Sequence, residues 1–231
     1  MLRVAVAGAL GKMGRVACTA LQHTSGVSYA GGLAHSRVPA DEIVDNVEEL
    51  FERKPDVLLD LTTHPSSVAI SMLAIAHGIR PVIGATGWSE QERATLAAMA
   101  DERGIGAMLV PNFSIGAVLM MRFAKEAARF FPSVEIVELH HDGKKDAPSG
   151  TSRLTAQRIT AGGGPANVPI HSVRMRGMLA HQEVLFGNDG EVLTIRHDSL
   201  ARESFVPGMI AAVNAVMNVR GLVVGIDNVF D

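Results

Sequence analysis

The chain has 231 residues, of which 47% are hydrophobic, so it can bury the core of one domain or two. Its net charge is −3 and only 4% of its residues are aromatic, which argues against a nucleic-acid binder that uses a basic surface or base stacking. The single cysteine, Cys18, cannot form an internal disulfide and fits a reducing compartment. There is no signal-peptide pattern and no apolar run of about 18 residues. We therefore expect a cytoplasmic protein without a nucleic-acid or membrane partner.

The chain begins with a strand, a glycine-rich turn and a helix. Arg3 to Ala7 is typical of a buried parallel strand, and an amphipathic helix is predicted from Lys12 to about His23. The glycines between them follow G-x-x-G-x-x-G spacing, a variant of the dinucleotide fingerprint, because the turn must be tight and its backbone must approach a pyrophosphate. The predicted cofactor contacts in this turn are Gly8, Gly11, Lys12, Met13 and Gly14. A tight turn without a ligand is the alternative.

The second strand, predicted from Val27 to Leu33, bears on the choice of cofactor. It lacks the acidic residue that a cofactor with a free 2′-hydroxyl usually meets at the end of this strand. His35, Ser36 and Arg37 stand there instead and suit a 2′-phosphate better. The sequence therefore favours NADPH over NADH and predicts His35 as a cofactor contact. The alternative, that His35 and Arg37 are ordinary solvated loop residues, stays open.

Strands and helices then alternate along the first half of the chain. Ser66 or Ser67 is expected to cap the helix that follows the polar turn after Asp60. The predicted strands are Asp56–Thr62, Arg80–Gly84 and Ile105–Val110, and further helices are predicted over Glu42–Arg53 and Glu90–Arg103. This alternation predicts an α/β fold with a Rossmann-like, doubly wound parallel sheet. Ligands bind such sheets beyond the carboxyl ends of the strands, where the turns after Gly8, Asp60 and Val82 lie.

The second half of the chain predicts a smaller α+β domain with an open mixed sheet and a helix on one face. Asn188 to Gly190 is a hairpin-turn signal between its last two strands. The predicted strands are Val134–Leu139, Ile170–Arg176, Ala180–Phe186 and Glu191–Arg196, and the predicted helices are Ala117–Phe130, about Thr151–Thr160, and Pro207 to about Val219.

The stretch Glu138–Thr151 concentrates chemistry-bearing residues. His140 and His141 can exchange protons near neutral pH, and Lys144 and Lys145 are cations with three donors each. Ser149 to Thr151, after Pro148, is typical of a helix cap and first turn, where free backbone N–H groups favour an anion. A proton donor, a cation and an anion hole side by side predict a reaction of a small, negatively charged molecule.

Strand alternation separates the two histidines of this stretch. His140 and His141 should point to opposite faces at the end of their strand, whereas Glu138 shares the face of His140. Glu138 is therefore expected to raise the pKa of His140 or to fix its tautomer. Arg174 and Arg176 are candidates for holding anions, with a solvated face as the alternative. His181 and His197 could meet across a hairpin, but no third ligand completes a zinc motif, and no metal site is predicted.

Several stretches together resemble the dihydrodipicolinate reductase (4-hydroxy-tetrahydrodipicolinate reductase) family of the diaminopimelate and lysine pathway. They match in order and spacing over nearly the whole chain, and the H-H-x-x-K-x-D-A-P-S-G-T run is highly specific to the family. The stretches are Gly8–Gly14, Asp60–Thr62, Gly84–Gly87, Pro111–Ser114, Glu138–His141, Lys144–Thr151 and Arg202–Phe205 with Gly208. The resemblance implies NAD(P)H-dependent reduction of a cyclic imine dicarboxylate, dihydrodipicolinate, to tetrahydrodipicolinate.

The resemblance also implies roles for single residues. His140 resembles the acid that protonates the substrate as hydride arrives, and Lys144 resembles the lysine that holds and polarises it. The residues that resemble carboxylate binders are His141, Gly150 and Thr151. The residues that resemble cofactor contacts are Thr62, Gly84, Thr86, Pro111, Asn112 and Phe113. The resemblance selects Lys144 rather than Lys145 for this role. The spacing of the residues alone does not decide between the two lysines.

The resemblance implies a dinucleotide-binding domain of residues 1–112 and 206–231, and a domain of residues 113–205 that binds substrate and builds a homotetramer through its open sheet. The chain departs from the family pattern in places. His64 adds one residue before Pro65, Gly84-Ala-Thr-Gly87 replaces the commoner Gly-Thr-Thr-Gly, and the chain is short. A short-chain dehydrogenase is disfavoured because the only tyrosine, Tyr29, has no lysine four residues on. A regulatory module that binds NAD(P)H without catalysis remains the alternative.

Overall fold

The structure, a computed structural model, describes residues 1–230 in two compact units. Within this range, one unit consists of residues 1–113 and 205–230, and the other of Ser114–Ser204. These bounds lie one residue from the predicted boundaries of the two domains. Among the described residues, no helix combines the length and the apolar character that crossing a bilayer requires.

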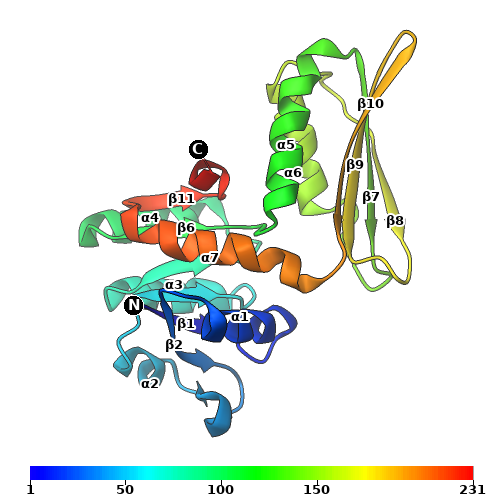
Figure 1. Cartoon of the computed structure of the whole chain (residues 1–231). Helices are drawn as coiled ribbons and strands as arrows, with labels where there is room; N and C mark the ends of the chain where they lie inside the picture. Colours follow the sequence, from blue (N-terminus) through cyan, green and yellow to red (C-terminus); the bar gives the residue numbers. More distant parts are fainter. Residues whose placement is uncertain (231) are drawn as a thin grey trace. The chain divides into compact units, whose positions relative to one another are not determined.

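The first unit is built on a seven-stranded sheet in the order β11-β6-β5-β4-β1-β2-β3 (Figure 1). All of its strand pairs are parallel. The strands are β1 Leu2–Ala7, β2 Val27–Leu33, β3 Ile43–Val44, β4 Val57–Asp60, β5 Arg80–Ile83, β6 Gly106–Leu109 and β11 Gly221–Val224. The predicted Rossmann-like sheet is confirmed, and so is the return of the C-terminal tail, because β11 pairs with β6.

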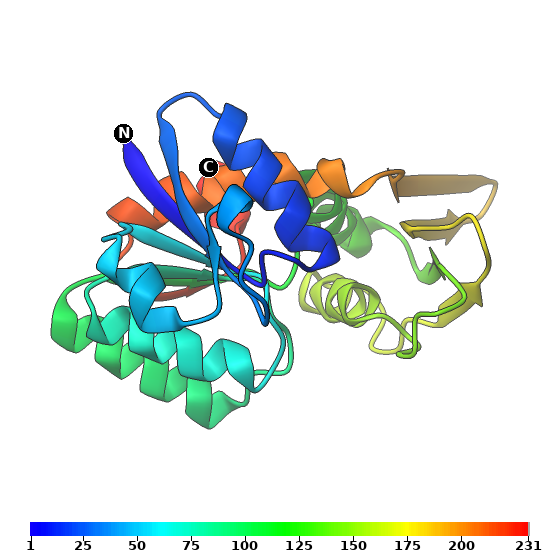
Figure 2. The ribbon, with the colours of Figure 1, turned by 90° about the horizontal axis from the view of Figure 1, so that it is seen from below.

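Helices cover both faces of this sheet (Figure 2). The α-helices are α1 Lys12–His23, α2 Val47–Glu52, α3 Ser66–Ala76, α4 Glu90–Arg103 and α7 Val206–Ala215, and short 3₁₀ turns are η1 Pro39–Asp41, η4 Val216–Asn218 and η5 Asp227–Phe230. A further 3₁₀ turn, η3 Arg202–Phe205, spans the boundary between the two units. Helices α1 and α7 contact each other, as do α3 and α4. The core strands are apolar on both faces, as expected for a parallel sheet buried on two sides, and Val4 to Ala7 of β1 are completely buried.

Two details of the first unit differ from the prediction. The helix expected over Glu42–Arg53 begins only at Val47, because Ile43 and Val44 add a strand beside β2 and Asn46 caps the helix by accepting from the N–H groups of Glu48 and Glu49. The predicted serine cap of α3 is also wrong. Pro65 is the cap residue of this helix, and the Ser67 hydroxyl donates instead to the buried carboxylate of Asp60.

The second unit is a four-stranded mixed sheet in the order β10-β9-β7-β8, with two helices (Figure 1). The strands are β7 Ser133–His140, β8 Ile170–Arg174, β9 Ala180–Asn188 and β10 Glu191–Ser199, and the helices are α5 Ile115–Ala127, continued by η2 Ala128–Phe130, and α6 Gly150–Ala161. Only β7 and β8 are parallel. The open mixed sheet and the hairpin turn at Gly190, with a φ of +79°, are therefore confirmed.

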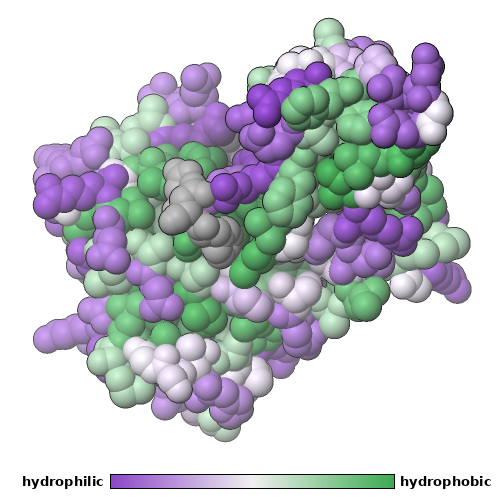
Figure 3. All heavy atoms as spheres, turned by 45° about the horizontal axis from the view of Figure 1, so that its top comes forward, coloured by the Kyte–Doolittle hydropathy of each residue, from purple (hydrophilic) through white to green (hydrophobic). Residues whose placement is uncertain are grey.

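Helices α5 and α6 lie against one face of this sheet, and the other face is open (Figure 1). Gln182 of β9 marks the covered face, since its amide donates to Thr155 of α6 at 2.7 Å and accepts from Ser152 at 2.7 Å. By strand pairing, Glu138 and His140 of β7 share this covered face with Gln182. The stretch Glu138–Thr151 therefore runs from the end of β7 to the start of α6. Hydrophobic residues (green in Figure 3) reach the surface of the chain between hydrophilic ones. The exposed hydrophobic residues of the second unit include Phe123, Phe130 and Val192.

Candidate active site

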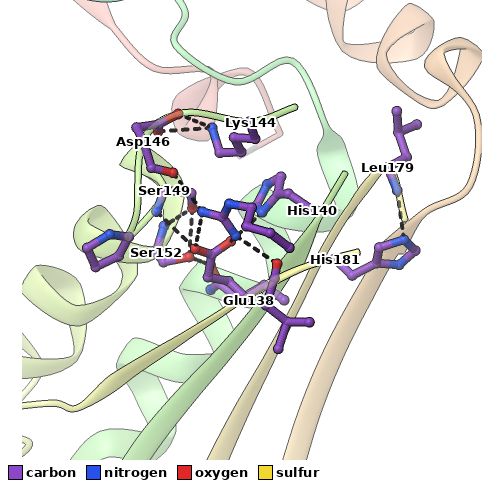
Figure 4. Close-up of polar contacts among 12 residues, drawn as sticks. Glu138, His140, Lys144, Asp146, Ser149, Ser152, Leu179 and His181 are labelled. Carbon is purple, nitrogen blue, oxygen red and sulfur yellow. Dashed lines mark hydrogen bonds and ion pairs between the residues drawn. The ribbon is translucent and has the colours of Figure 1, made fainter. Parts of the chain in front are cut away.

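A buried carboxylate, that of Glu138 in β7, is the centre of the candidate site (Figure 4). Its Oε1 accepts from Arg174 Nη2 at 2.8 Å and from the backbone N–H of Ser149 at 3.3 Å. Its Oε2 accepts from Arg174 Nη1 at 3.0 Å and pairs with Nδ1 of His140. Burial alone raises the pKa of Glu138, but the hydrogen bonds from Arg174 lead a set of opposing effects that hold this pKa below its usual range. Glu138 is therefore an ionised carboxylate with several donors.

The pKa of His140 is lower than that of a free histidine. Burial is the largest cause, because a side chain that is only 14% exposed is poorly solvated as a cation. The carboxylate of Glu138 acts in the opposite direction, and the nearby cations of Lys144 and Arg174 add to the lowering. The predicted contact between Glu138 and His140 is confirmed, and Glu138 raises the pKa of His140 as predicted, but burial outweighs this effect and the net shift is downward. The contact occupies Nδ1 and leaves Nε2 as the ring nitrogen available to a ligand.

A short loop between β7 and α6 holds the cation of the site. Lys144 Nζ contacts both carboxylate oxygens of Asp146, at 2.7 and 2.9 Å, and its side chain is 22% exposed (Figure 4). The hydrogen bond from Lys144 is the main reason that the pKa of Asp146 is lowered. Asp146 is itself 49% exposed, and exposed ion pairs are weak, so a ligand carboxylate can replace or join it at little cost. Lys145 and His141 are exposed neighbours in the same loop.

The start of helix α6 supplies an anion-binding position. Ser149 is its cap residue, and its hydroxyl accepts from the N–H of Ser152 at 3.1 Å, as the sequence predicted. Gly150 is exposed, and a Cβ atom placed on it would meet no other atom within 4 Å. A carboxylate can therefore approach the helix N-terminus at Gly150, where backbone N–H groups and the helix dipole favour negative charge.

The glycine turn after β1, in the first unit, has the tight geometry of a nucleotide cradle. Gly8 has a φ of +81°, and a Cβ on it would lie 2.8 Å from the carbonyl oxygen of Leu61. A Cβ on Gly14 would lie 2.0 Å from the carbonyl oxygen of Gly8. Helix α1 begins after Gly11 without a side-chain cap, so its N-terminus can take a phosphate. Only glycine allows the turn to pack this closely against its own backbone, which is the tight turn that a dinucleotide-binding motif requires.

The other predicted cofactor contacts lie in turns at the carboxyl ends of β4, β5 and β6 in the same unit. A Cβ on Gly84 would lie 2.8 Å from the ring of Phe113, so these two residues are in contact. Thr86 and Pro111 are exposed, and Thr62 is half-buried. His35 is also exposed, beyond the end of β2. Arg37 pairs with Glu49, with Nη1 2.9 Å from Oε1, and with Asp45 at 3.1 Å.

A buried polar network supports the turn that carries Thr62. Asp60, fully buried at the end of β4, accepts through Oδ1 from the backbone N–H of Thr62 at 2.9 Å and from its hydroxyl at 2.6 Å. Its Oδ2 accepts from Ser67 and from Ser71, the latter at 3.3 Å. The indole of Trp88, in the turn after β5, donates to the Ser67 hydroxyl at 3.3 Å. Asp60 thus connects the Thr62 turn to helix α3, and Ser67 connects the Trp88 turn to the same helix.

Replacing Asp60 with Asn is expected to lower the free energy of unfolding by about 1–3 kcal/mol, because the amide would direct its own N–H groups at hydroxyl donors. The KM for the nicotinamide cofactor should rise, since the Thr62 turn loses its support. Thermal unfolding and cofactor titration measure the two effects. Glu52→Gln, the same change at an exposed site of this unit, is the control and should shift stability by less than about 0.5 kcal/mol. Equal stabilities of the two variants would contradict the role of Asp60.

Family models for dihydrodipicolinate reductase match both parts of the chain, the N-terminal model over residues 2–113 and the C-terminal model over residues 116–230. Two curated relatives named 4-hydroxy-tetrahydrodipicolinate reductase, from Bacillus pumilus and Bacillus subtilis, are 42% and 40% identical. Each alignment covers 100% of this chain and 98% of the relative. The chain belongs to the dihydrodipicolinate reductase family. The 262 aligned positions exceed its 231 residues, so it is the shorter member of each pair.

Solved structures agree with this family assignment. A dihydrodipicolinate reductase from Paenisporosarcina sp. TG-14, solved with dipicolinate bound, is 39% identical, covers 99% of both chains and superposes with a TM-score of 0.87. The gentamicin-pathway protein GenD2, solved in complex with NAD, is 16% identical with a TM-score of 0.67 over 94% of this chain and 86% of its own, which shows a shared fold alone. As a member of the reductase family, the chain is an oxidoreductase, and its Rossmann-type unit implies a nicotinamide cofactor.

The candidate site also includes residues whose part in it the sequence did not predict. Arg174 contacts Glu138 across the parallel pair β7 and β8, whereas the sequence only made it a candidate for holding anions. The sequence does contain a pattern that indicates the Asp60 network: Ser67 and Ser71 are four residues apart and so lie on one face of helix α3. His181 and His197 have separate partners, because His181 binds Asp198 at 2.7 Å and His197 contacts Ser114 at 3.1 Å. Among residues 1–230, no group of three metal-ligand side chains comes together.

Proposed function

We propose that this chain reduces dihydrodipicolinate, formed from 4-hydroxy-tetrahydrodipicolinate, to tetrahydrodipicolinate with NAD(P)H in diaminopimelate and lysine biosynthesis. The observation that carries the proposal is the arrangement in the second unit of an acid paired with a buried carboxylate, a cation and a helix N-terminus. These are the groups that a cyclic imine with two carboxylates requires. Relatives of 40% and 42% identity carry the corresponding name, and a relative of 39% identity has been solved with dipicolinate.

The proposed catalytic residues are His140 and Lys144. Bound NAD(P)H supplies the hydride that reduces the imine. His140 donates a proton from Nε2, because Glu138 occupies Nδ1 and stabilises the imidazolium form. The lowered pKa of His140 makes the imidazolium a stronger acid, which favours transfer of its proton to the substrate.

The proposed substrate-binding residues are Lys144, His141, Gly150 and Thr151. Lys144 turns from Asp146 toward a substrate carboxylate, and the exposed position of Asp146 keeps the cost of this exchange small. The other carboxylate meets the N-terminus of α6 at Gly150 and Thr151, where an anion is favoured. His141, which is exposed at the start of the loop, contributes a further donor.

The proposed cofactor-binding residues lie in the first unit, in the turns after β1, β2, β4, β5 and β6. Gly8, Gly11, Lys12, Met13 and Gly14 would hold the pyrophosphate, in a turn whose close backbone packing only glycine allows at Gly8 and Gly14. The remaining proposed contacts are His35, Thr62, Gly84, Thr86, Pro111, Asn112 and Phe113.

Substrate-dependent oxidation of the cofactor tests the proposed reaction. The protein is mixed with NADPH and freshly prepared cyclic imine, and the loss of cofactor absorbance is followed. We expect oxidation only when both substrates and the protein are present. Binding of NADPH without turnover would overturn the proposal and support a regulatory module. Absence of NADPH and NADH binding would overturn the assignment of the first unit as well.

We propose that NADPH is preferred over NADH. Arg37 lies near the end of β2, and its two carboxylate partners are exposed, so its guanidinium can turn to a 2′-phosphate at little cost. Arg37→Ala is expected to lower kcat/KM for NADPH about tenfold, the value of one charged hydrogen bond, and to leave NADH nearly unchanged. Steady-state kinetics with both cofactors measures the ratio. Arg220→Ala, at an exposed arginine of the same unit, is the control. Equal losses for NADPH and NADH in Arg37→Ala would contradict the preference.

We propose that the open face of the second unit's sheet joins copies of the chain into a homotetramer. This face combines the exposed apolar side chain of Val192 with ion pairs between Glu135 and His171 and between Glu183 and Arg196. Large one-sided sheets with exposed apolar residues are typical of interaction surfaces. Sedimentation measures the assembly, and a monomer at micromolar concentration would contradict it. We also place the protein in the cytoplasm, which cell fractionation tests.

A further inference from the structure

Arg174 stands at the end of β8, where its guanidinium binds two parts of the candidate site at once. Nη1 and Nη2 donate to the two oxygens of Glu138 at 3.0 and 2.8 Å, which is the bidentate arrangement of an arginine and a carboxylate. Nη2 also donates to the backbone carbonyl oxygen of Asp146 at 2.6 Å. The side chain is only 18% exposed. One planar cation therefore connects strand β7 with the loop between β7 and α6.

These two connections lead to the two proposed catalytic groups. Glu138 binds Nδ1 of His140, so the position of its carboxylate sets the orientation of the imidazole ring. Asp146 binds the ammonium group of Lys144 through its side chain, while its backbone is held by Arg174. The positions of His140 and Lys144 thus both depend on the guanidinium of Arg174, through Glu138 and Asp146. Neither connection requires Arg174 to touch the substrate.

The charge of Arg174 also makes the buried carboxylate possible. Glu138 is fully buried, and a buried carboxylate without a cation would take up a proton or turn away. The charged groups that face His140 are Glu138 of its own strand, Lys144 of the loop and Arg174 of β8. Glu138 favours the imidazolium form, and the two cations disfavour it. The position of Arg174 therefore affects both the ring orientation and the charge around it.

We propose that Arg174 is a positioning residue for the reduction: it holds Glu138 and the Lys144 loop together, and so fixes the proton-donating edge of His140 relative to the substrate-binding ammonium group. The inference rests on the proposed function. A single positive charge could not orient Glu138 in this way. The guanidinium of Arg174 can, because its two N–H groups lie in one plane and donate in a fixed direction.

The variant Arg174→Lys distinguishes the effect of the planar guanidinium from the effect of its positive charge. Lysine keeps the positive charge beside Glu138 but loses the planar fork. We expect kcat for the imine to fall about 10–100-fold, as a displacement of catalytic groups by about 1 Å would produce. KM for the imine should rise severalfold, and KM for NADPH should stay within about twofold of wild type, since the cofactor contacts lie in the other unit. The matched control is Arg176→Lys, whose side chain is 92% exposed and pairs with Asp142 at 3.1 Å, and it should retain wild-type kinetics.

A double-mutant cycle distinguishes positioning from a structural role. In a His140→Ala background, Arg174→Lys should lower kcat by a clearly smaller factor than in wild type, because no imidazole remains to be oriented and only the effect on the Lys144 loop is left. Nitrogen NMR of His140 gives a readout without turnover: Nδ1 should carry the proton of the neutral ring in wild type, and the ring should become a mixture of tautomers in Arg174→Lys. If the lysine variant does not fold, Arg174→Gln keeps one donor to Glu138 and takes its place.

Three outcomes would overturn the inference. One is an active wild type whose kcat is unchanged by Arg174→Lys. Another is a loss of the same size with and without His140, together with an unaltered tautomer, which would make Arg174 a residue of the fold alone. The third is failure of both variants to fold. An inactive wild type would instead overturn the proposed function, and the NMR comparison would still report whether Arg174 orients His140.

Discussion

His140→Ala is expected to lower kcat by about 10²–10⁴-fold and to change KM for the imine by less than about threefold, because general-acid catalysis acts mainly in the transition state. The ring is held at Nδ1 by Glu138, so its removal eliminates the proton donor without removing the lysine or the helix N-terminus that bind carboxylates. Steady-state kinetics at saturating NADPH gives both parameters. A kcat within threefold of wild type would remove His140 from the acid role.

The pH profile gives a second measure of the same residue. The imidazolium form is the acid, so kcat of the wild type should fall as the pH rises through the pKa of His140. Burial holds this pKa below the ordinary value of histidine, so the fall should begin on the acidic side of that value. His140→Ala should lack this limb. His77→Ala is the matched control, since His77 also pairs with a glutamate, Glu48, at 3.4 Å but is 41% exposed in the first unit. It should retain the wild-type profile.

Lys144→Ala is expected to lower kcat and raise KM for the imine together, with a combined loss in kcat/KM of about 10²–10³-fold, or about 3–4 kcal/mol. The ammonium group binds and polarises the substrate, so it contributes to the ground state as well as to the transition state. Removal of Lys144 also removes the main cause of the lowered pKa of Asp146, which should rise toward its usual value. NMR titration of Asp146 therefore verifies the contact independently of turnover.

Lys145→Ala is the control for this prediction, because it removes the same charge from the adjacent, exposed residue. It should change kcat/KM less than about threefold, as expected for a solvated charge near a site. A larger loss for Lys145→Ala than for Lys144→Ala would exchange the roles of the two lysines. KM for NADPH should be unaffected in both variants, since the proposed cofactor contacts lie in the first unit.

Much of the fold and part of the site follow from the sequence, because they depend on neighbours along the chain. The period of apolar residues and the spacing of glycines around Gly8 and Gly14 predict the parallel sheet and its turn, which are local steric requirements. Ser149 predicts a helix start because its side chain can bond only the next turn of its own chain. Alternation along one strand places Glu138 and His140 on the same face, and their contact is present.

The tertiary structure decided what depends on residues far apart in the sequence. Ile43 and Val44 form a strand rather than a helix because the edge of β2 offers them backbone partners. The direction of the pKa shift of His140 depends on how deeply the ring is buried, which its neighbours in sequence do not determine. Arg174 reaches Glu138 from 36 residues away, since the register of β7 and β8 aligns the two strands. That register supplies the guanidinium that connects Glu138, and with it His140, to the lysine loop.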